Sequence, residues 1–174
     1  GEVVATVTGP GGQDTLRAGR LMVAVGRRPV TENLGLGSVG VDTGAHGEIL
    51  VDARMATSNP RVWAAGDVTG HPQYVYVASA HGVTAVENAF DRTGQQIDYT
   101  HLPRVTFTSP AIAAVGMTDQ QAREAGLRCE CRVLPLEYVP RALVNRDTRG
   151  FVKIVAEAET GRIVGITAVA KDAG

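Results

Sequence analysis

One short segment, residues 56–67, restricts the fold of this chain more than any other. It reads Ala-Thr-Ser-Asn-Pro-Arg-Val-Trp-Ala-Ala-Gly-Asp, so a polar turn leads into a short apolar run that stops at a glycine and an acid. The run predicts a strand over residues 61–65. Strands of open α/β sheets bring their carboxyl ends to the ligand crevice. There Gly66 would let a ligand approach the backbone, and Asp67 would accept hydrogen bonds from sugar-like hydroxyls.

The residues beyond Asp67 predict a helix. Between residues 75 and 89, apolar and small side chains recur at spacings of three and four, which indicates a helical stripe. The free N–H groups and the positive end of this helix would suit an anionic group of a ligand. A strand followed by a Gly-Asp turn also occurs without any ligand. The residues alone therefore leave two interpretations open, a structural turn and a nucleotide-binding carboxylate.

The first half of the chain otherwise predicts short strands joined by turns. We expect strands over residues 2–8, 20–25 and 48–51, the second of them buried. Gly-Pro-Gly-Gly at residues 9–12 predicts a turn. The second strand should end at Gly-Arg-Arg-Pro, because proline restricts the residue before it. Residues 33–47 contain five glycines and predict a loop with at most one helical turn.

A change of pattern after the polar residues 91–102 predicts a domain boundary there. Thr118 and Gln121 predict a capping box at the start of a helix that ends at Gly126. Strand and hairpin patterns occupy residues 104–108, 111–116, 128–134, 151–156 and 162–169, with a turn at 159–161. This order predicts an α+β domain with an antiparallel sheet.

Composition and charge narrow the classes of partner. The formal net charge of −1 gives no electrostatic reason to expect nucleic acid or an anionic membrane surface as a partner. No apolar run approaches the roughly 18 residues of a membrane span. The chain begins with Gly1 rather than Met, and no signal-peptide pattern follows. We therefore expect an internal part of a longer cytoplasmic protein.

The two cysteines, Cys129 and Cys131, occur in the sequence Arg-Cys-Glu-Cys-Arg. Alternation along a strand places both thiols on one face, too far apart for a relaxed disulfide. Two interpretations stay open, half of a soft-metal site and structural thiols on a half-buried strand face. We expect the structural role, because no further ligands cluster nearby. The low cysteine count is typical of a reducing cytoplasm.

Four segments resemble the pyridine nucleotide–disulfide oxidoreductases. Thr57 with Ala-Ala-Gly-Asp at residues 64–67 resembles the second flavin-binding motif of that family. Residues 23–29, Val-Ala-Val-Gly-Arg-Arg-Pro, resemble the motif at the exit of its NAD(P) domain. Two further runs are similar to the mercuric reductase branch of the family: residues 71–78, His-Pro-Gln-Tyr-Val-Tyr-Val-Ala, and residues 139–153, which begin Val-Pro-Arg-Ala.

The resemblance implies a fold in two parts. The first is an incomplete, Rossmann-like FAD/NAD(P)-binding portion of the α/β class, and the second is an α+β interface (dimerisation) domain that is incomplete at its C-terminus. Residues 1–30 are expected to end the NAD(P)-binding domain, residues 31–98 to form the C-terminal part of the FAD-binding domain, and residues 99–174 to form the interface domain.

The resemblance also implies cofactor-binding residues. Gly66, Asp67 and Val75 are expected to bind FAD, and Gly26 to lie beside the nicotinamide cofactor. No catalytic or metal-binding residue is expected within this chain, because the redox cysteine pairs of the family have no counterpart in it. Where the family has alanine, this chain has His81, which we expect to be packed or solvated rather than catalytic.

The implied activity is the reduction of Hg(II), presented as a thiolate, to Hg(0). NADPH would supply the electrons through FAD, with NADH as the alternative donor, in a homodimer formed through residues 99–174. The chain by itself is expected to be inactive. A dihydrolipoamide dehydrogenase-like enzyme is the alternative within the family. A non-catalytic FAD-binding or interaction module is the alternative outside the enzymes.

Overall fold

The computed structural model describes residues 1–91 and 93–174. They divide into two compact units, Gly1–Gln96 and Ile97–Gly174. The division falls within the polar residues 91–102. The assignment of three successive domains to residues 1–30, 31–98 and 99–174 stays a prediction.

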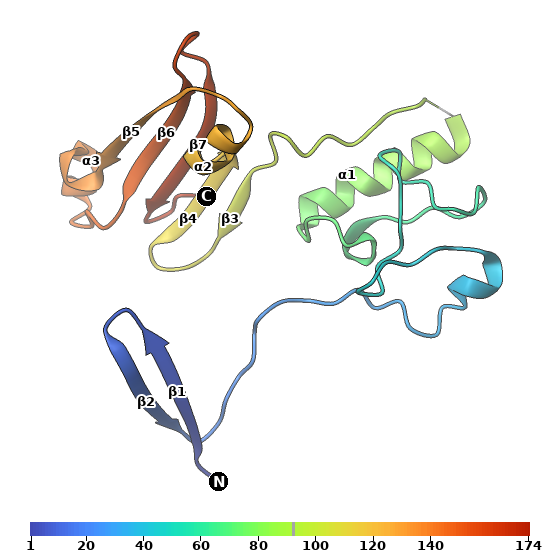
Figure 1. The fold of residues 1–174 in the computed structure, drawn as a ribbon, viewed down its shortest axis with the longest axis horizontal. Coiled ribbons are helices and arrows are strands. Elements are labelled where there is room, and N and C mark those ends of the chain that lie inside the picture. Colours follow the sequence, from blue (N-terminus) through green and yellow to red (C-terminus); the bar gives the residue numbers. More distant parts are fainter. Residues whose placement is uncertain (92) are drawn as a thin grey trace. The chain divides into compact units, whose positions relative to one another are not determined.

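An antiparallel hairpin opens the first unit. Strands β1 (Val3–Gly9) and β2 (Gly12–Ala18) pair along their whole length, from Val3 opposite Ala18 to Gly9 opposite Gly12 (Figure 1). The predicted strand and the predicted turn are confirmed. The sequence did not predict β2, because its residues are mostly polar and give no apolar run of the kind that marks a strand.

The predicted buried strand over residues 20–25 is wrong. This segment forms no strand, and it pairs with no other segment that the structure describes. Its apolar side chains stand in solvent, with Val25 92% exposed and Met22 86% exposed. A strand requires a neighbour for its backbone N–H and C=O groups. Residues 20–25 have the apolar pattern of a strand, but no described segment supplies the backbone partner that a strand needs.

A small apolar cluster holds the middle of the first unit. Val41, Ile49 and Ala64 are buried, and partly buried apolar side chains pack against them: Leu36, Val51, Val62 and Val68. The predicted strands over residues 48–51 and 61–65 reduce to two isolated bridges, Thr43 with Ile49 and Ala56 with Trp63. The 3₁₀-helix η1 (Leu36–Val39) is the single helical turn expected in the glycine-rich loop.

Helix α1 (Val75–Val86) confirms the predicted helix and continues into the π-helical turn η3 (Glu87–Asp91). A shorter 3₁₀-helix, η2 (Gly66–Thr69), precedes it and packs against it. The buried side of α1 comprises Val77, His81, Thr84 and Ala85. The Gly66-Asp67 pair therefore begins a helical turn rather than ending a regular strand.

The second unit is a five-stranded antiparallel sheet with the order β3-β4-β7-β6-β5 (Figure 1). Its strands are β3 (Arg104–Thr106), β4 (Ala111–Gly116), β5 (Cys129–Pro135), β6 (Phe151–Glu157) and β7 (Ile163–Ala170). Strands β3 and β5 form the two edges. On β5, Glu130 and Arg132 are exposed and form an ion pair at 3.5 Å. The predicted α+β domain with an antiparallel sheet is confirmed.

Helix α2 (Asp119–Glu124) follows β4 and begins with the predicted capping box. The amide of Gln121 donates to the Thr118 hydroxyl at 3.2 Å, and the Thr118 amide donates to the Gln121 side chain at 2.9 Å. Asp119 pairs with Lys153 on β6, and this lysine is the main reason why the pKa of Asp119 lies below its ordinary value.

Two short helical segments between β5 and β6 were not predicted. They are η4 (Leu136–Tyr138) and α3 (Pro140–Val144). Pro140 occupies the first turn of α3, where its missing N–H costs no hydrogen bond. Helices this short leave too few periods for a helical stripe to be recognised in the sequence.

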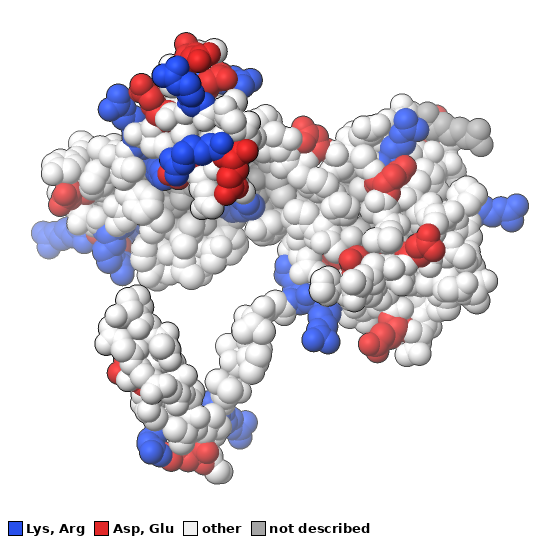
Figure 2. Space-filling view, in the orientation of Figure 1, with Lys and Arg blue, Asp and Glu red and all other residues white. Residues whose placement is uncertain are grey.

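Charged side chains of both signs are mixed over the visible face (Figure 2). Within residues 1–91 and 93–174, no helix combines the length and the apolar character that crossing a membrane requires.

Replacing Thr118 with alanine should lower the free energy of unfolding by about 1 kcal/mol, because the amide of Gln121 loses its acceptor. Urea denaturation of the wild type and of Thr118→Ala measures this difference. The Thr118→Ser variant keeps a hydroxyl at the same position and should retain most of the stability. Equal losses in both variants would contradict the capping role.

Candidate functional site

Gly66 lies against α1. Its amide donates a hydrogen bond to Nδ1 of His81 at 3.1 Å. A Cβ atom added to Gly66 would lie 3.2 Å from the Cβ of Ala78, and the φ angle of Gly66 is 79°. Both the close approach and the left-handed backbone favour glycine. The turn that carries Asp67 is thus tied to the helix that follows it.

Asp67 is partly open to solvent. Its side chain is 48% exposed, and one oxygen lies 3.8 Å from Nε of Arg27. Arg27 also donates from Nε to the side chain of Gln73 at 3.1 Å and from Nη2 to the carbonyl oxygen of Gln73. The structure therefore brings the Gly-Arg-Arg-Pro motif, the Gly-Asp motif and the start of α1 together.

A groove of about 530 Å³ lies beside this meeting point. Its lining consists of Arg27, Pro29, His46, Glu48, Gly70, His71, Pro72 and Gln73. Arg27 lines the groove and pairs with Asp67, and it also donates to Gln73 of the same lining. The Asp67 carboxylate therefore lies next to the groove, rather than in a buried ion pair away from it.

Val75 is the first residue of α1, and its side chain is 88% exposed. The N-cap residue, Tyr74, has an extended backbone and supplies no side-chain hydrogen bond to the helix. Amides in the first turn of an α-helix have no partner within the helix itself. The Tyr74 and Tyr76 rings stack beside this turn, with centroids 5.2 Å apart.

Gly26 occupies the extended segment just before Arg27. Its φ angle is 142°, and no atom lies within 4 Å of the position that a Cβ would take. The structure brings Gly66, Asp67 and Val75 to η2 and the start of α1. Gly26 is connected to this region through the next residue, Arg27, which pairs with Asp67.

His81 is the residue whose role the sequence underestimated. Its side chain is fully buried, as expected for a packed residue, but it also accepts the Gly66 hydrogen bond. Its ring meets the edge of the His71 ring, with centroids 5.7 Å apart. Burial, and secondarily the charge of His71, lower the pKa of His81 below 6.5. A histidine in a stripe of small residues, three positions beyond Ala78, was the signal in the sequence.

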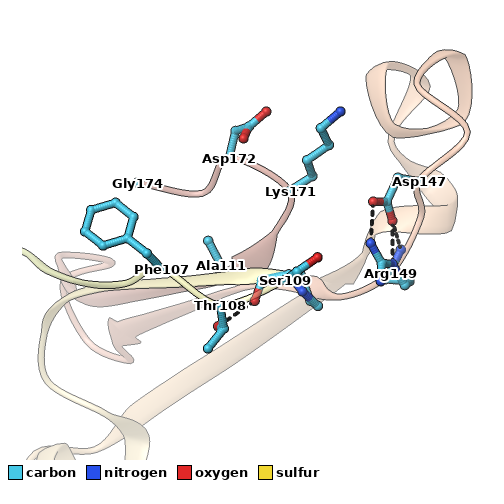
Figure 3. A pocket seen from close by; sticks show the side chains of 10 residues that line it. Phe107, Thr108, Ser109, Ala111, Asp147, Arg149, Lys171, Asp172 and Gly174 are labelled. Carbon is cyan, nitrogen blue, oxygen red and sulfur yellow. Dashed lines mark hydrogen bonds and ion pairs between the residues drawn. The ribbon is translucent and has the colours of Figure 1, made fainter. Parts of the chain in front are cut away.

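A second cavity, of about 610 Å³, lies in the other unit (Figure 3). Asp147 and Arg149 face each other there through hydrogen bonds of 2.9 and 2.8 Å. This pairing lowers the pKa of Asp147 to about 2. Lys171 and Asp172 add one charge of each sign to the lining. None of the four cofactor-binding residues expected from the sequence lines this cavity.

Cys129 and Cys131 are free thiols on the edge strand β5, as expected. Local desolvation, and then the neighbouring Cys129, raise the pKa of the Cys131 thiol. A thiol with a raised pKa is a poor metal ligand near neutral pH, because the thiolate is the form that binds. In the part of the chain that the structure describes, no cluster of three or more His, Cys, Asp or Glu side chains is placed to hold a metal ion.

Two family models match the chain. Residues 1–82 match the model described as pyridine nucleotide-disulphide oxidoreductase. Residues 102–174 match the model described as the dimerisation domain of the same family. The two matches confirm the predicted fold class, a pyridine nucleotide-disulphide oxidoreductase portion followed by a dimerisation domain.

Curated relatives and solved structures agree with these models. The chain is 56% identical over 172 residues to a mercuric reductase of Streptomyces lividans, which covers 99% of this chain and 36% of the relative. It is 47% identical to a mercuric reductase of Bacillus cereus over 91% of this chain and 25% of the relative. The chain thus spans about a third or less of the length of these relatives. The HOCl-induced flavoprotein disulfide reductase RclA of Escherichia coli matches with a TM-score of 0.81 and 31% identity, over 91% of this chain and 37% of that one.

The buried His81 should make stability depend on pH. Its pKa in the folded state lies below 6.5, so the unfolded state binds a proton more readily. The contribution of the neutral His81 ring to the free energy of unfolding is complete above about pH 6.5. It is lost as the pH falls toward the pKa of the folded state. We expect the unfolding midpoint of the wild type to fall more between pH 7.5 and 5.5 than that of His81→Asn. Parallel pH profiles for the two proteins would contradict this assignment.

Proposed function

Because this chain belongs to the pyridine nucleotide-disulphide oxidoreductases, we propose that it is part of an FAD-dependent enzyme that reduces Hg(II) to Hg(0) with NADPH. The observation that carries the proposal is the 56% identity to a mercuric reductase along 99% of the chain. The site described above adds a physical reason, since its exposed groups suit a flavin nucleotide. NADH stays the alternative electron donor.

The residues at the start of α1 fit FAD. Glycine is favoured at position 66, because a Cβ there would crowd Ala78 and the backbone is left-handed. Asp67 offers a half-exposed carboxylate, which can accept hydrogen bonds from the hydroxyls of a ribityl chain. The first turn of α1 begins at the exposed Val75, and the positive end of a helix favours an anionic group of a ligand. These three residues would hold the cofactor, and Gly26 would lie beside the nicotinamide.

When bound, FAD would supply the two-electron chemistry that links NADPH to the thiolate-bound Hg(II) substrate. The part played by this chain is to bind and orient. Asp67 would hold the sugar-like part of the cofactor, and Arg27 would keep the Asp67 carboxylate facing the groove. The redox cysteines would come from other parts of the full-length enzyme, so this chain alone should be inactive.

The proposal extends to assembly and location. A dimerisation-domain model matches residues 102–174, which supports a homodimer formed through residues 99–174. A cytoplasmic location would suit two free thiols, because disulfides are rare in reducing compartments. Hg(II) thiolates would be the substrate there, since soft ligands bind soft cations.

Asp67→Ala in the full-length flavoprotein should weaken FAD retention tenfold or more, because the hydroxyls of the cofactor lose a charged acceptor. Flavin fluorescence after dialysis measures the fraction retained. Glu32→Ala removes an exposed carboxylate from the same unit and should retain FAD like the wild type. Full retention by Asp67→Ala would contradict the proposed FAD site.

The full-length enzyme should oxidise NADPH in the presence of Hg(II) thiolate and release Hg(0). Replacing both Cys129 and Cys131 with serine should leave this rate near that of the wild type, because neither thiol belongs to the cofactor site. A tenfold fall in turnover, about 1.4 kcal/mol in barrier, with unchanged flavin content would mean that the pair handles metal.

Two other outcomes of the same assay favour the alternatives. Turnover with dihydrolipoamide but not with Hg(II) thiolate would favour a dihydrolipoamide dehydrogenase-like enzyme. Bound FAD with no turnover on either substrate would favour a non-catalytic flavin-binding module.

A further inference from the structure

We propose that His81 is a positioning residue for FAD, which acts by holding the amide of Gly66 and thereby the turn that carries Asp67. The proposal rests on the FAD site proposed above. It assigns a cofactor-related role to a buried side chain that does not itself line the groove.

The Gly66 amide stands at the start of a helical turn. Gly66 is the first residue of η2, and the first amides of any helix lack partners within it. The preceding residue, Ala65, provides no side-chain cap. His81 on α1 supplies the acceptor instead, at 3.1 Å. One hydrogen bond thus caps η2 and fastens it to α1.

Further hydrogen bonds hold the rest of the turn. The Thr69 hydroxyl donates to the carbonyl oxygen of Gly66 at 2.8 Å, and the Gly70 amide donates to the carbonyl oxygen of Asp67 at 3.3 Å. Both bonds lie within the turn itself. A bond from the Ile49 amide to the carbonyl oxygen of Val68, at 2.8 Å, ties the turn to the preceding loops. The His81 bond ties it to α1, so it bears on the position of Asp67 relative to that helix.

The acceptor of the Gly66 bond is a ring nitrogen of histidine. Nδ1 can accept a hydrogen bond only when it carries no proton. The buried position of His81 favours this neutral form, as its lowered pKa indicates. His71, in the loop between η2 and α1, faces the same ring and favours the neutral form as well.

Three substitutions separate this role from simple packing. Asparagine can place an amide oxygen where Nδ1 of His81 lies, so His81→Asn should keep the bond to Gly66. Glutamine is longer by one bond and sets its oxygen elsewhere. Leucine keeps an apolar volume similar to that of the ring and accepts nothing. Packing alone would rank leucine at least as high as asparagine.

The experiment measures the dissociation constant of FAD for the full-length apoprotein by flavin fluorescence. His81→Leu and His81→Gln should each bind FAD roughly tenfold more weakly than the wild type, which is about 1.4 kcal/mol. His81→Asn should stay within about threefold of the wild type. The Ala85→Gly variant is the matched control, because it destabilises α1 from another buried position without touching the acceptor.

Rescue by asparagine but not by leucine or glutamine supports the proposal. Equal weakening in all three variants overturns it, as does a loss of FAD in Ala85→Gly that matches the loss in His81→Leu. If His81→Leu does not fold, the comparison of asparagine with glutamine decides in the same way. Loss of FAD in Asp67→Ala without loss in His81→Leu overturns the role of His81 alone, whereas retention in Asp67→Ala overturns the FAD site itself.

Discussion

A hydrogen bond from the Gly66 amide to the His81 ring joins the loops of the first unit to α1. It links the turn that carries Asp67 to a regular helix, whereas the loops before that turn contain only isolated bridges. The small apolar cluster around Val41 and Ile49 supports the loops from one side. The buried face of α1 supports them from the other side, and His81 on that face holds the turn that carries Asp67.

The sequence predicted the second unit almost completely because its signals are local. The capping box of Thr118 and Gln121 and the alternating strands need only their own neighbours along the chain. The first unit is harder to predict from its sequence. Residues 20–25 carry an apolar pattern typical of a strand, yet no described segment pairs with them. A sequence pattern indicates which side chains of a segment can be buried, but not which other segment will pack against them.

The same distinction applies to the site. Gly66 and Asp67 could be predicted, since a strand-like run, a glycine and an acid stand side by side in the sequence. The contacts that orient them could not, because they join distant positions. Arg27 and Gln73 lie 46 residues apart, and Gly66 and His81 lie 15 apart. No local periodicity encodes such pairs, so only the folded backbone reveals them.

The order of the sheet in the second unit has a consequence for how this protein behaves at high concentration. An exposed edge strand is a template on which another chain can add a strand and start aggregation. Strand β3 is only three residues long. Strand β5 carries the charged pair Glu130 and Arg132 and ends at Pro135, which has no N–H to donate. Both edges therefore disfavour the addition of a strand from another chain.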